Sequence, residues 1–302
     1  MVDSHVHLQD FIKPEDLAVY LKELGRQDVT GLLSVSYDIE SSRKAVELLK
    51  SYEKISETAS LHIAAGIHPQ YIGDNPDRQI AELSEILNDN KSISAIGEIG
   101  LDYRKDMPDR ELQKEVFRKQ LEMSLEYSLP VSIHSVSACE DTLKILHAYP
   151  DAKGIMHGYA YSAEAAKGFI KQGFMLGVGT TLLKSGAKKL PETVKAVPQE
   201  YLVTETDLPF SYTQAITTKF QAGDTINSVD IKQHQNSTQL SQVQSMEPDS
   251  LSHKKSTPAS DDGNALECEY FTSDTLKETA ELHAALLREL VNKIQPVHLK
   301  FK

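Results

Sequence analysis

Residues 154–178, GIMHGYAYSAEAAKGFIKQGFMLGV, contain a strand, a helix and a second strand in direct succession. The short apolar runs Gly154–His157 and Phe174–Val178 have the length and composition of buried strands. Between them, Ser162 before an alanine-rich turn is typical of a helix N-cap, and Gly173 is typical of a helix end. A strand, a helix and a strand in this order predict two parallel strands joined by a right-handed crossover.

The same unit recurs along the first two-thirds of the chain, with segments of helical periodicity between the strands. The predicted strands are Val2–Val6, Gly31–Val35, Leu61–Ile67, Ser92–Ile99, Pro130–His134, Gly154–His157, Phe174–Val178 and Tyr201–Thr206. Eight such units predict an α/β protein with a closed (β/α)₈ TIM barrel rather than an open doubly wound sheet. No glycine-rich dinucleotide fingerprint follows the first strand, which also disfavours the open sheet.

The pattern changes after about Ala222. Residues 223–264 are rich in Ser, Gln, Asn, Asp and Thr, and we predict a disordered polar insert there. A final helix is expected to begin near Ser273 and to pack on the barrel by its apolar stripe. His283 on this helix has no partner pattern, and we assign it no role. The predicted domains are a catalytic barrel over 1–222, the insert over 223–264 and a C-terminal helical segment over 265–302.

Composition and charge narrow the class of protein. The formal net charge of −12 argues against broad, non-specific binding to phosphates. No run of eighteen apolar residues exists, so no membrane span is expected. The N-terminus does not resemble a signal peptide, and two cysteines are too few for a disulfide framework. We therefore expect a cytoplasmic protein, and we expect it to be a monomer.

Residue types that bind divalent metal ions follow the predicted strands. In His5-Val6-His7, the alternation of a strand points both imidazoles to one face. Active sites of (β/α)₈ barrels lie at the C-terminal strand ends. The ligand-type residues at those ends are His5, His7, His68, Glu98, His134, His157, Glu205 and Asp207. Four of these histidines with two of these carboxylates already exceed the three protein ligands of one catalytic zinc, which favours a site for two ions.

The motifs at these strand ends resemble those of the TatD-like metal-dependent hydrolases, the TatD family DNases of the amidohydrolase superfamily. The resemblance covers roughly residues 1–209 and is carried by DSHVHL (3–8), GIHP (66–69), GEIGLDY (97–103), PVSIHS (130–135), MHG (156–158) and ETDLP (205–209). The metal ligands that it implies are His5, His7, Glu98, His134, His157 and Asp207. It also implies that Glu98 bridges two ions, and that the activity is a divalent-dependent deoxyribonuclease, including 3′-exonuclease action.

On this interpretation the cofactors are two divalent ions, such as Mg²⁺, Zn²⁺ or Mn²⁺, which activate a bridging water. Glu98 and Asp207 are the expected catalytic residues, with Asp207 as both ligand and general base. The expected partner is DNA or a small phosphodiester, contacted by His68, Tyr103 and Arg104. Because the two ions carry more charge than the two carboxylates neutralise, the site is locally cationic within an acidic protein.

Departures from the family pattern leave two alternatives open. Val136-Ser137 stand where family members often carry Arg-Asp, and an arginine there would be a natural phosphate contact. The residues after His157 and the C-terminal segment also differ. The first alternative is a hydrolase of an amide, ester or lactone within the same superfamily. The second is a non-catalytic protein with a residual metal site.

Overall fold

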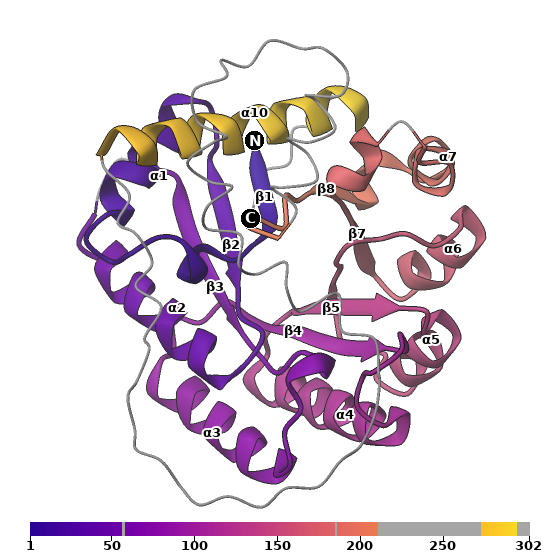
Figure 1. Cartoon of the computed structure of the whole chain (residues 1–302). Coiled ribbons are helices and arrows are strands. Elements are labelled where there is room, and N and C mark those ends of the chain that lie inside the picture. The colour runs from indigo at the N-terminus through magenta and orange to yellow at the C-terminus, as the bar shows by residue number, and fades with distance from the viewer. Residues whose placement is uncertain (56–57, 185, 211–272, 295–302) are drawn as a thin grey trace, which may run out of the picture. The chain divides into compact units, whose positions relative to one another are not determined.

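The computed structural model describes residues 1–55, 58–184, 186–210 and 273–294, and all of these fall in one compact unit. Eight parallel strands follow one another in the order β1 to β8 and form a nearly closed barrel. The helices lie outside the strands (Figure 1). The predicted TIM barrel is confirmed.

The elements alternate as expected. The strands are β1 (Val2–Val6), β2 (Gly31–Val35), β3 (Ser60–Ala65), β4 (Ala95–Asp102), β5 (Val131–Val136), β6 (Gly154–Met156), β7 (Phe174–Val178) and β8 (Leu202–Thr204). The α-helices are α1 (Leu17–Arg26), α2 (Ile39–Tyr52), α3 (Pro76–Asp89), α4 (Arg110–Tyr127), α5 (Cys139–His147), α6 (Ala163–Lys171), α7 (Lys189–Ala196) and α10 (Ser273–Ile294). Short 3₁₀ turns are η1 (Leu8–Asp10), η2 (Pro69–Tyr71), η3 (Thr180–Leu183) and η4 (Gln199–Tyr201). None of the described helices combines the length and apolar character needed to cross a bilayer.

Local sequence signals explain where α6 begins and ends. The Ser162 hydroxyl accepts a hydrogen bond from the Ala165 N–H at 3.3 Å, as an N-cap does. Gly173 follows the helix with φ +89°, a conformation that glycine adopts without steric cost, and its N–H donates to the Ile170 carbonyl at 2.8 Å. The chain then enters β7 directly, so both predicted helix signals are confirmed.

The ends of β3 and β4 differ from the predicted ranges. β3 ends at Ala65 rather than at Ile67, because its ladder with β4 stops there. At the next residue, Gly66, a Cβ would meet the Gly97 backbone at 2.7 Å, so the two strands approach too closely for a side chain. β4 continues past the predicted end, since its last residues pair with β5 as far as Asp102.

Backbone and side-chain hydrogen bonds join β8 and the residues after it to β1. The Thr204 hydroxyl donates to the Val2 carbonyl at 2.6 Å. Beyond the strand, the Asp207 N–H donates to the His5 carbonyl at 2.9 Å, and the His7 N–H donates to the Leu208 carbonyl at 2.8 Å. The two ends of the barrel sheet therefore run side by side where the predicted ligands lie.

Helix α10 packs against α1 and contacts β8, as its expected place outside the barrel requires (Figure 1, yellow). Its His283 is fully buried, with Nε2 lying 2.6 Å from Asp3 Oδ2 and Nδ1 lying 2.8 Å from the Tyr20 hydroxyl. Assigning His283 no role from the sequence was therefore wrong. The role was missed because Asp3 and Tyr20 lie far from His283 in the sequence. The predicted insert over 223–264 and the domain limits beside it lie outside the described residues.

Replacing His283 with alanine should destabilise the barrel. The change leaves Asp3 and Tyr20 buried without this hydrogen-bond partner, so we expect the free energy of unfolding to fall by about 1–3 kcal/mol. Urea unfolding followed by circular dichroism measures it. His147→Ala is the matched control, because His147 is exposed and should change stability by less than about 0.5 kcal/mol. Equal effects of the two substitutions would contradict the structural role of His283.

Candidate metal centre

The structure brings all six predicted ligands together at one end of the barrel. They come from five strands or from the residues just beyond them: His5 and His7 (β1), Glu98 (β4), His134 (β5), His157 (β6) and Asp207 (β8). The Nε2 atoms of His5 and His7 lie only 3.2 Å apart, as expected for neighbouring side chains on one face of a strand. The parallel register therefore turns residues that are distant in sequence into one cluster.

Glu98 lies at the centre of the cluster and is almost fully buried. Its Oε2 is 3.5 Å from His5 Nε2, and its Oε1 is 2.8 Å from His134 Nδ1. Oε1 also lies 3.9 Å from His68 Nε2 and 3.8 Å from His157 Nε2. One carboxylate thus faces four imidazoles and reaches both sides of the cluster.

Backbone contacts fix His7 and Asp207 in position. His7 Nδ1 donates to the Val35 carbonyl at 2.7 Å, which leaves Nε2 to face Asp207 Oδ1 at 3.2 Å. Asp207 has φ +58°, a left-handed conformation that few residues other than glycine adopt. The hydrogen bond from its N–H to the His5 carbonyl holds this conformation. Strained backbone of this kind is common where a side chain must be aimed at a site.

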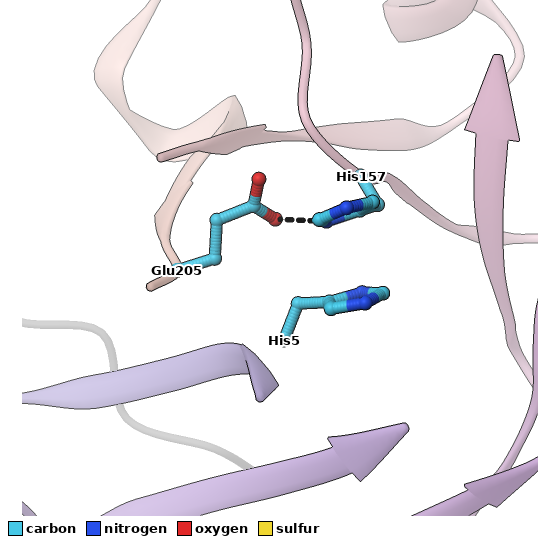
Figure 2. Close-up of side chains that lie close together, drawn as sticks. All are labelled: His5, His157 and Glu205. Carbon is cyan, nitrogen blue, oxygen red and sulfur yellow. Dashed lines mark ion pairs between the residues drawn. The ribbon is translucent and has the colours of Figure 1, made fainter. Parts of the chain in front are cut away.

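Glu205 joins the cluster beside His157 and His5, as Figure 2 shows. Its Oε2 lies 3.1 Å from His157 Nδ1, and the His157 ring stacks on the His5 ring with centroids 3.4 Å apart. The Gly158 N–H donates to Glu205 Oε1 at 2.7 Å. On the neighbouring strand β7, a Cβ at Gly177 would overlap the Glu205 carboxylate, so glycine leaves the room that Glu205 occupies. The sequence placed Glu205 at a strand end but did not include it among the predicted ligands.

The donor set fits divalent metal ions. Three groups of side chains each bring ligand atoms within 4.8 Å of one another: His5, His7 and Glu98; His68, Glu98 and His134; and His5, His157 and Glu205. His157 Nδ1 and Glu205 Oε2 are buried and face each other without forming a hydrogen bond. Converging imidazoles and carboxylates in a buried place are costly unless a positive charge lies among them. Imidazole with carboxylate is the combination that zinc, manganese and similar ions prefer.

The pKa values of the imidazoles divide them into two kinds. Burial lowers the pKa of His5, and it lowers the pKa of His68 to about 4, so these rings are neutral at pH 7. Burial also opposes charge on the other rings, but neighbouring carboxylates outweigh it and raise the pKa of His7 and of His134. The Glu205 and Glu98 carboxylates raise the pKa of His157 to about 10.

A second set of groups orients the cluster. The Ser132 hydroxyl lies 3.2 Å from His5 Nδ1, and Asp102 Oδ2 lies 3.1 Å from His134 Nε2. Partners of this kind fix the orientation of metal-binding imidazoles. Asp102 is fully buried, and sequence reasoning did not single it out. Strand alternation could have found it, because residues 98 and 102 share a face of β4.

The three predicted substrate contacts lie at different distances from the cluster. His68 is inside it, and its Nδ1 accepts a hydrogen bond from the Gln70 N–H at 3.0 Å. Arg104 joins it through Asp102, to which its guanidinium donates at 2.9 and 3.0 Å. The Tyr103 hydroxyl donates to Asp141 at 2.6 Å, away from the cluster. Arg104 and Tyr103 line a pocket of about 580 Å³ beside the end of β4.

Comparison with known proteins places this arrangement in a family. The model of the family described as TatD related DNase matches residues 2–254. An uncharacterized metal-dependent hydrolase of Bacillus subtilis, YabD, is 34% identical over 212 residues, which cover 70% of this chain and 80% of the relative. The deoxyribonuclease Tat-D of Schizosaccharomyces pombe is 28% identical over 204 residues, 65% of each chain. The crystal structure of the TatD homologue YjjV from Escherichia coli superposes with a TM-score of 0.62 at 26% identity, covering 68% of this chain and 78% of that one.

Removing the central carboxylate should weaken metal binding. Glu98→Gln keeps the size of the side chain but removes the charge that faces four imidazoles, so we expect metal affinity to fall by at least about tenfold. Titration calorimetry with Mn²⁺ or Zn²⁺ measures affinity and stoichiometry. Glu85→Gln is the matched control, because Glu85 is exposed on α3. Unchanged stoichiometry and affinity in Glu98→Gln would contradict the placement of the metal.

Metal affinity should rise with pH. An imidazole must lose its proton to bind a metal. The pKa of His157 is raised to about 10, so this ring holds a proton at neutral pH, and the pKa values of His7 and His134 are raised in the same direction. Each proton that the metal displaces changes the apparent affinity by about tenfold per pH unit. Calorimetry at pH 6, 7 and 8, in buffers of different ionisation enthalpy, counts these protons. An affinity independent of pH would show that the metal binds elsewhere.

Proposed function

The chain belongs to the TatD-related DNase family of metal-dependent hydrolases, and from that membership we propose that it hydrolyses phosphodiester bonds in DNA, removing nucleotides from a 3′ end. The observation that carries the proposal is the convergence of His5, His7, Glu98, His134, His157 and Asp207 at one end of the barrel. The deoxyribonuclease of Schizosaccharomyces pombe supports it as a relative that is named for this activity.

The six convergent side chains would hold two divalent ions, and Glu98 would be the carboxylate within reach of both. When bound, such ions lower the pKa of a water and stabilise charge that develops on the phosphoryl oxygens. Glu98 suits the shared position because its Oε2 faces His5 while its Oε1 faces His134 and His157. Burial opposes its charge, but the surrounding imidazoles hold the pKa of Glu98 well below its usual range, so it is ionised.

Asp207 is the proposed proton acceptor. Its Oδ1 lies between His7 Nε2, at 3.2 Å, and His157 Nε2, at 4.0 Å, and its side chain is about one-third exposed. Burial opposes its charge, yet the hydrogen bond from His7 and the nearby imidazoles lower the pKa of Asp207. The carboxylate is therefore ionised and reaches the solvent side of the cluster, where Oδ1 or Oδ2 takes a proton from an attacking water.

His68 is the proposed donor to the phosphoryl group. Because its Nδ1 accepts from the Gln70 N–H, the proton of the neutral ring is on Nε2, which faces the centre of the cluster. Burial keeps the pKa of His68 at about 4, so the ring stays neutral and offers a hydrogen bond without adding a charge. This role does not depend on the arginine that family members often carry after the fifth strand.

One observation favours the hydrolysis of an amide, ester or lactone as a second candidate. Val136 and Ser137 stand where an arginine would contact a phosphate, and they follow His134 at the end of β5. Without that cation, phosphate binding depends on the metal ions, His68 and the more distant Arg104. A panel of substrates therefore has to include uncharged esters and amides as well as DNA.

The test is cleavage of a 3′-labelled single-stranded oligonucleotide with Mg²⁺, Mn²⁺ or Zn²⁺, beside the ester and amide panel. We expect metal-dependent release of the label, and a fall in kcat of about 10²–10⁴-fold in Asp207→Asn. Asp89→Asn on the exposed end of α3 is the matched control and should cleave like the wild type. Turnover of esters or amides alone would favour the second candidate. Turnover of nothing by the metal-loaded protein would overturn both.

A further inference from the structure

Three aromatic side chains border one side of the metal centre, and together we call them the aromatic rim: Tyr37, Tyr71 and Phe210. Tyr37 follows β2, Tyr71 ends the turn after β3, and Phe210 follows β8. The Tyr37 ring lies 4.7 Å from the Tyr71 ring and 6.3 Å from the Phe210 ring, measured between centroids. Loops from three strand ends therefore place three rings next to one another.

The aromatic rim touches the metal centre directly. The Phe210 ring meets the His7 ring edge to face with centroids 4.9 Å apart, and the Tyr71 ring lies 6.0 Å from the His68 ring. Tyr37 lies 5.7 Å from His7. A flat ligand seated on these rings would therefore lie beside the groups that we assign to the scissile phosphate.

Two of these three rings are not part of the buried core. Phe210 is 54% exposed and Tyr71 is 39% exposed. Among the described residues only Val19 and Leu125 are large hydrophobic side chains of comparable exposure, and they lie on the helices α1 and α4. Two apolar faces left in solvent beside a polar cluster are typical of a binding surface. Tyr37 is half-buried and contacts both of these rings, and its hydroxyl donates to Asp10 at 3.2 Å.

We propose that the aromatic rim stacks the nucleobase of a nucleotide whose phosphate lies at the metal centre. The proposal rests on the proposed function, because it takes the phosphodiester at the metal ions as given. A base is joined to its own phosphate by a single sugar, so the two groups reach neighbouring sites. Stacking on aromatic side chains accepts any base, since every base has a flat face. The rim thus selects single-stranded nucleic acid over small phosphodiesters that lack a base.

The first experiment compares two oligonucleotides that differ only in one base. One carries a base and the other an abasic tetrahydrofuran residue, placed in turn at the 3′-terminal and the adjacent nucleotide. The wild type should cleave the base-bearing strand with a kcat/KM about tenfold higher at one of these positions. The double variant Tyr71→Leu/Phe210→Leu keeps apolar bulk but removes both exposed rings, so it should cleave both strands at the lower rate.

Conservative variants separate stacking from a merely structural effect. Tyr71→Phe and Phe210→Tyr keep the rings and should keep the preference for the base, mainly through an unchanged KM. Leu125→Ala is the matched control, because Leu125 is also 39% exposed but lies on α4. Equal cleavage of base-bearing and abasic strands by the wild type, or an unchanged preference in the double variant, would overturn the proposal.

A second measurement does not depend on catalysis. In an Asp207→Asn background, an oligonucleotide with 2-aminopurine at the preferred position should lose fluorescence on binding, and the double variant should abolish this quenching. If Asp207→Asn shows quenching that depends on the two rings but the wild type cleaves no DNA, the aromatic rim is supported and the proposed reaction is overturned. If the wild type cleaves DNA but Asp207→Asn shows no quenching, the proposed reaction is supported and the aromatic rim is overturned.

Discussion

The buried carboxylate of Asp3 is the group that holds the two ends of the barrel sheet in register. Its Oδ1 accepts from the His5 N–H at 3.1 Å and from the Thr206 N–H at 3.0 Å. Its Oδ2 accepts from the Thr206 hydroxyl at 2.5 Å and faces His283 at 2.6 Å. Four partners replace the water that a fully buried carboxylate loses. Because His5 and Asp207 flank the two segments so joined, the geometry of the metal centre depends on this closure.

The metal centre brings many buried ionisable side chains close together, and packing alone does not offset the cost of their charges. Imidazoles with lowered pKa values lie against imidazoles with raised ones, and His5 stacks on His157 at 3.4 Å. Ionised Glu98, Asp207 and their neighbours favour cations in the space between them. When no metal is bound, protons on the imidazoles neutralise these carboxylates. A divalent ion would supply more positive charge in a smaller volume. The arrangement of these side chains therefore suits divalent metal ions.

Features that depend on local sequence patterns could be predicted, whereas features that depend on contacts between residues distant in sequence could not. The barrel, the strand ends and the convergence of the predicted ligands depend on local patterns that repeat, such as the strand and helix signals around Ser162 and Gly173. Glu205 was left out of the ligand set because its place depends on which strands are neighbours, namely on the space that Gly177 leaves on β7. Asp102 was missed although the alternation of β4 puts it on the same face as Glu98. The end of β3 was misplaced because the close approach of Gly66 to Gly97 is a contact between strands. His283 was missed because Asp3 is 280 residues away.

That last separation sets an order of assembly during synthesis. Strand β1, which carries Asp3, His5 and His7, is synthesised before α10, because His283 follows Asp3 by 280 residues. Contacts this distant in sequence form late, because the loop between them must be closed first. Until α10 has been synthesised, the Asp3 carboxylate of β1 therefore lacks one of its partners. A chain interrupted before residue 283 would hold all six side chains assigned to the metal ions but would leave the buried Asp3 carboxylate without one of its four partners.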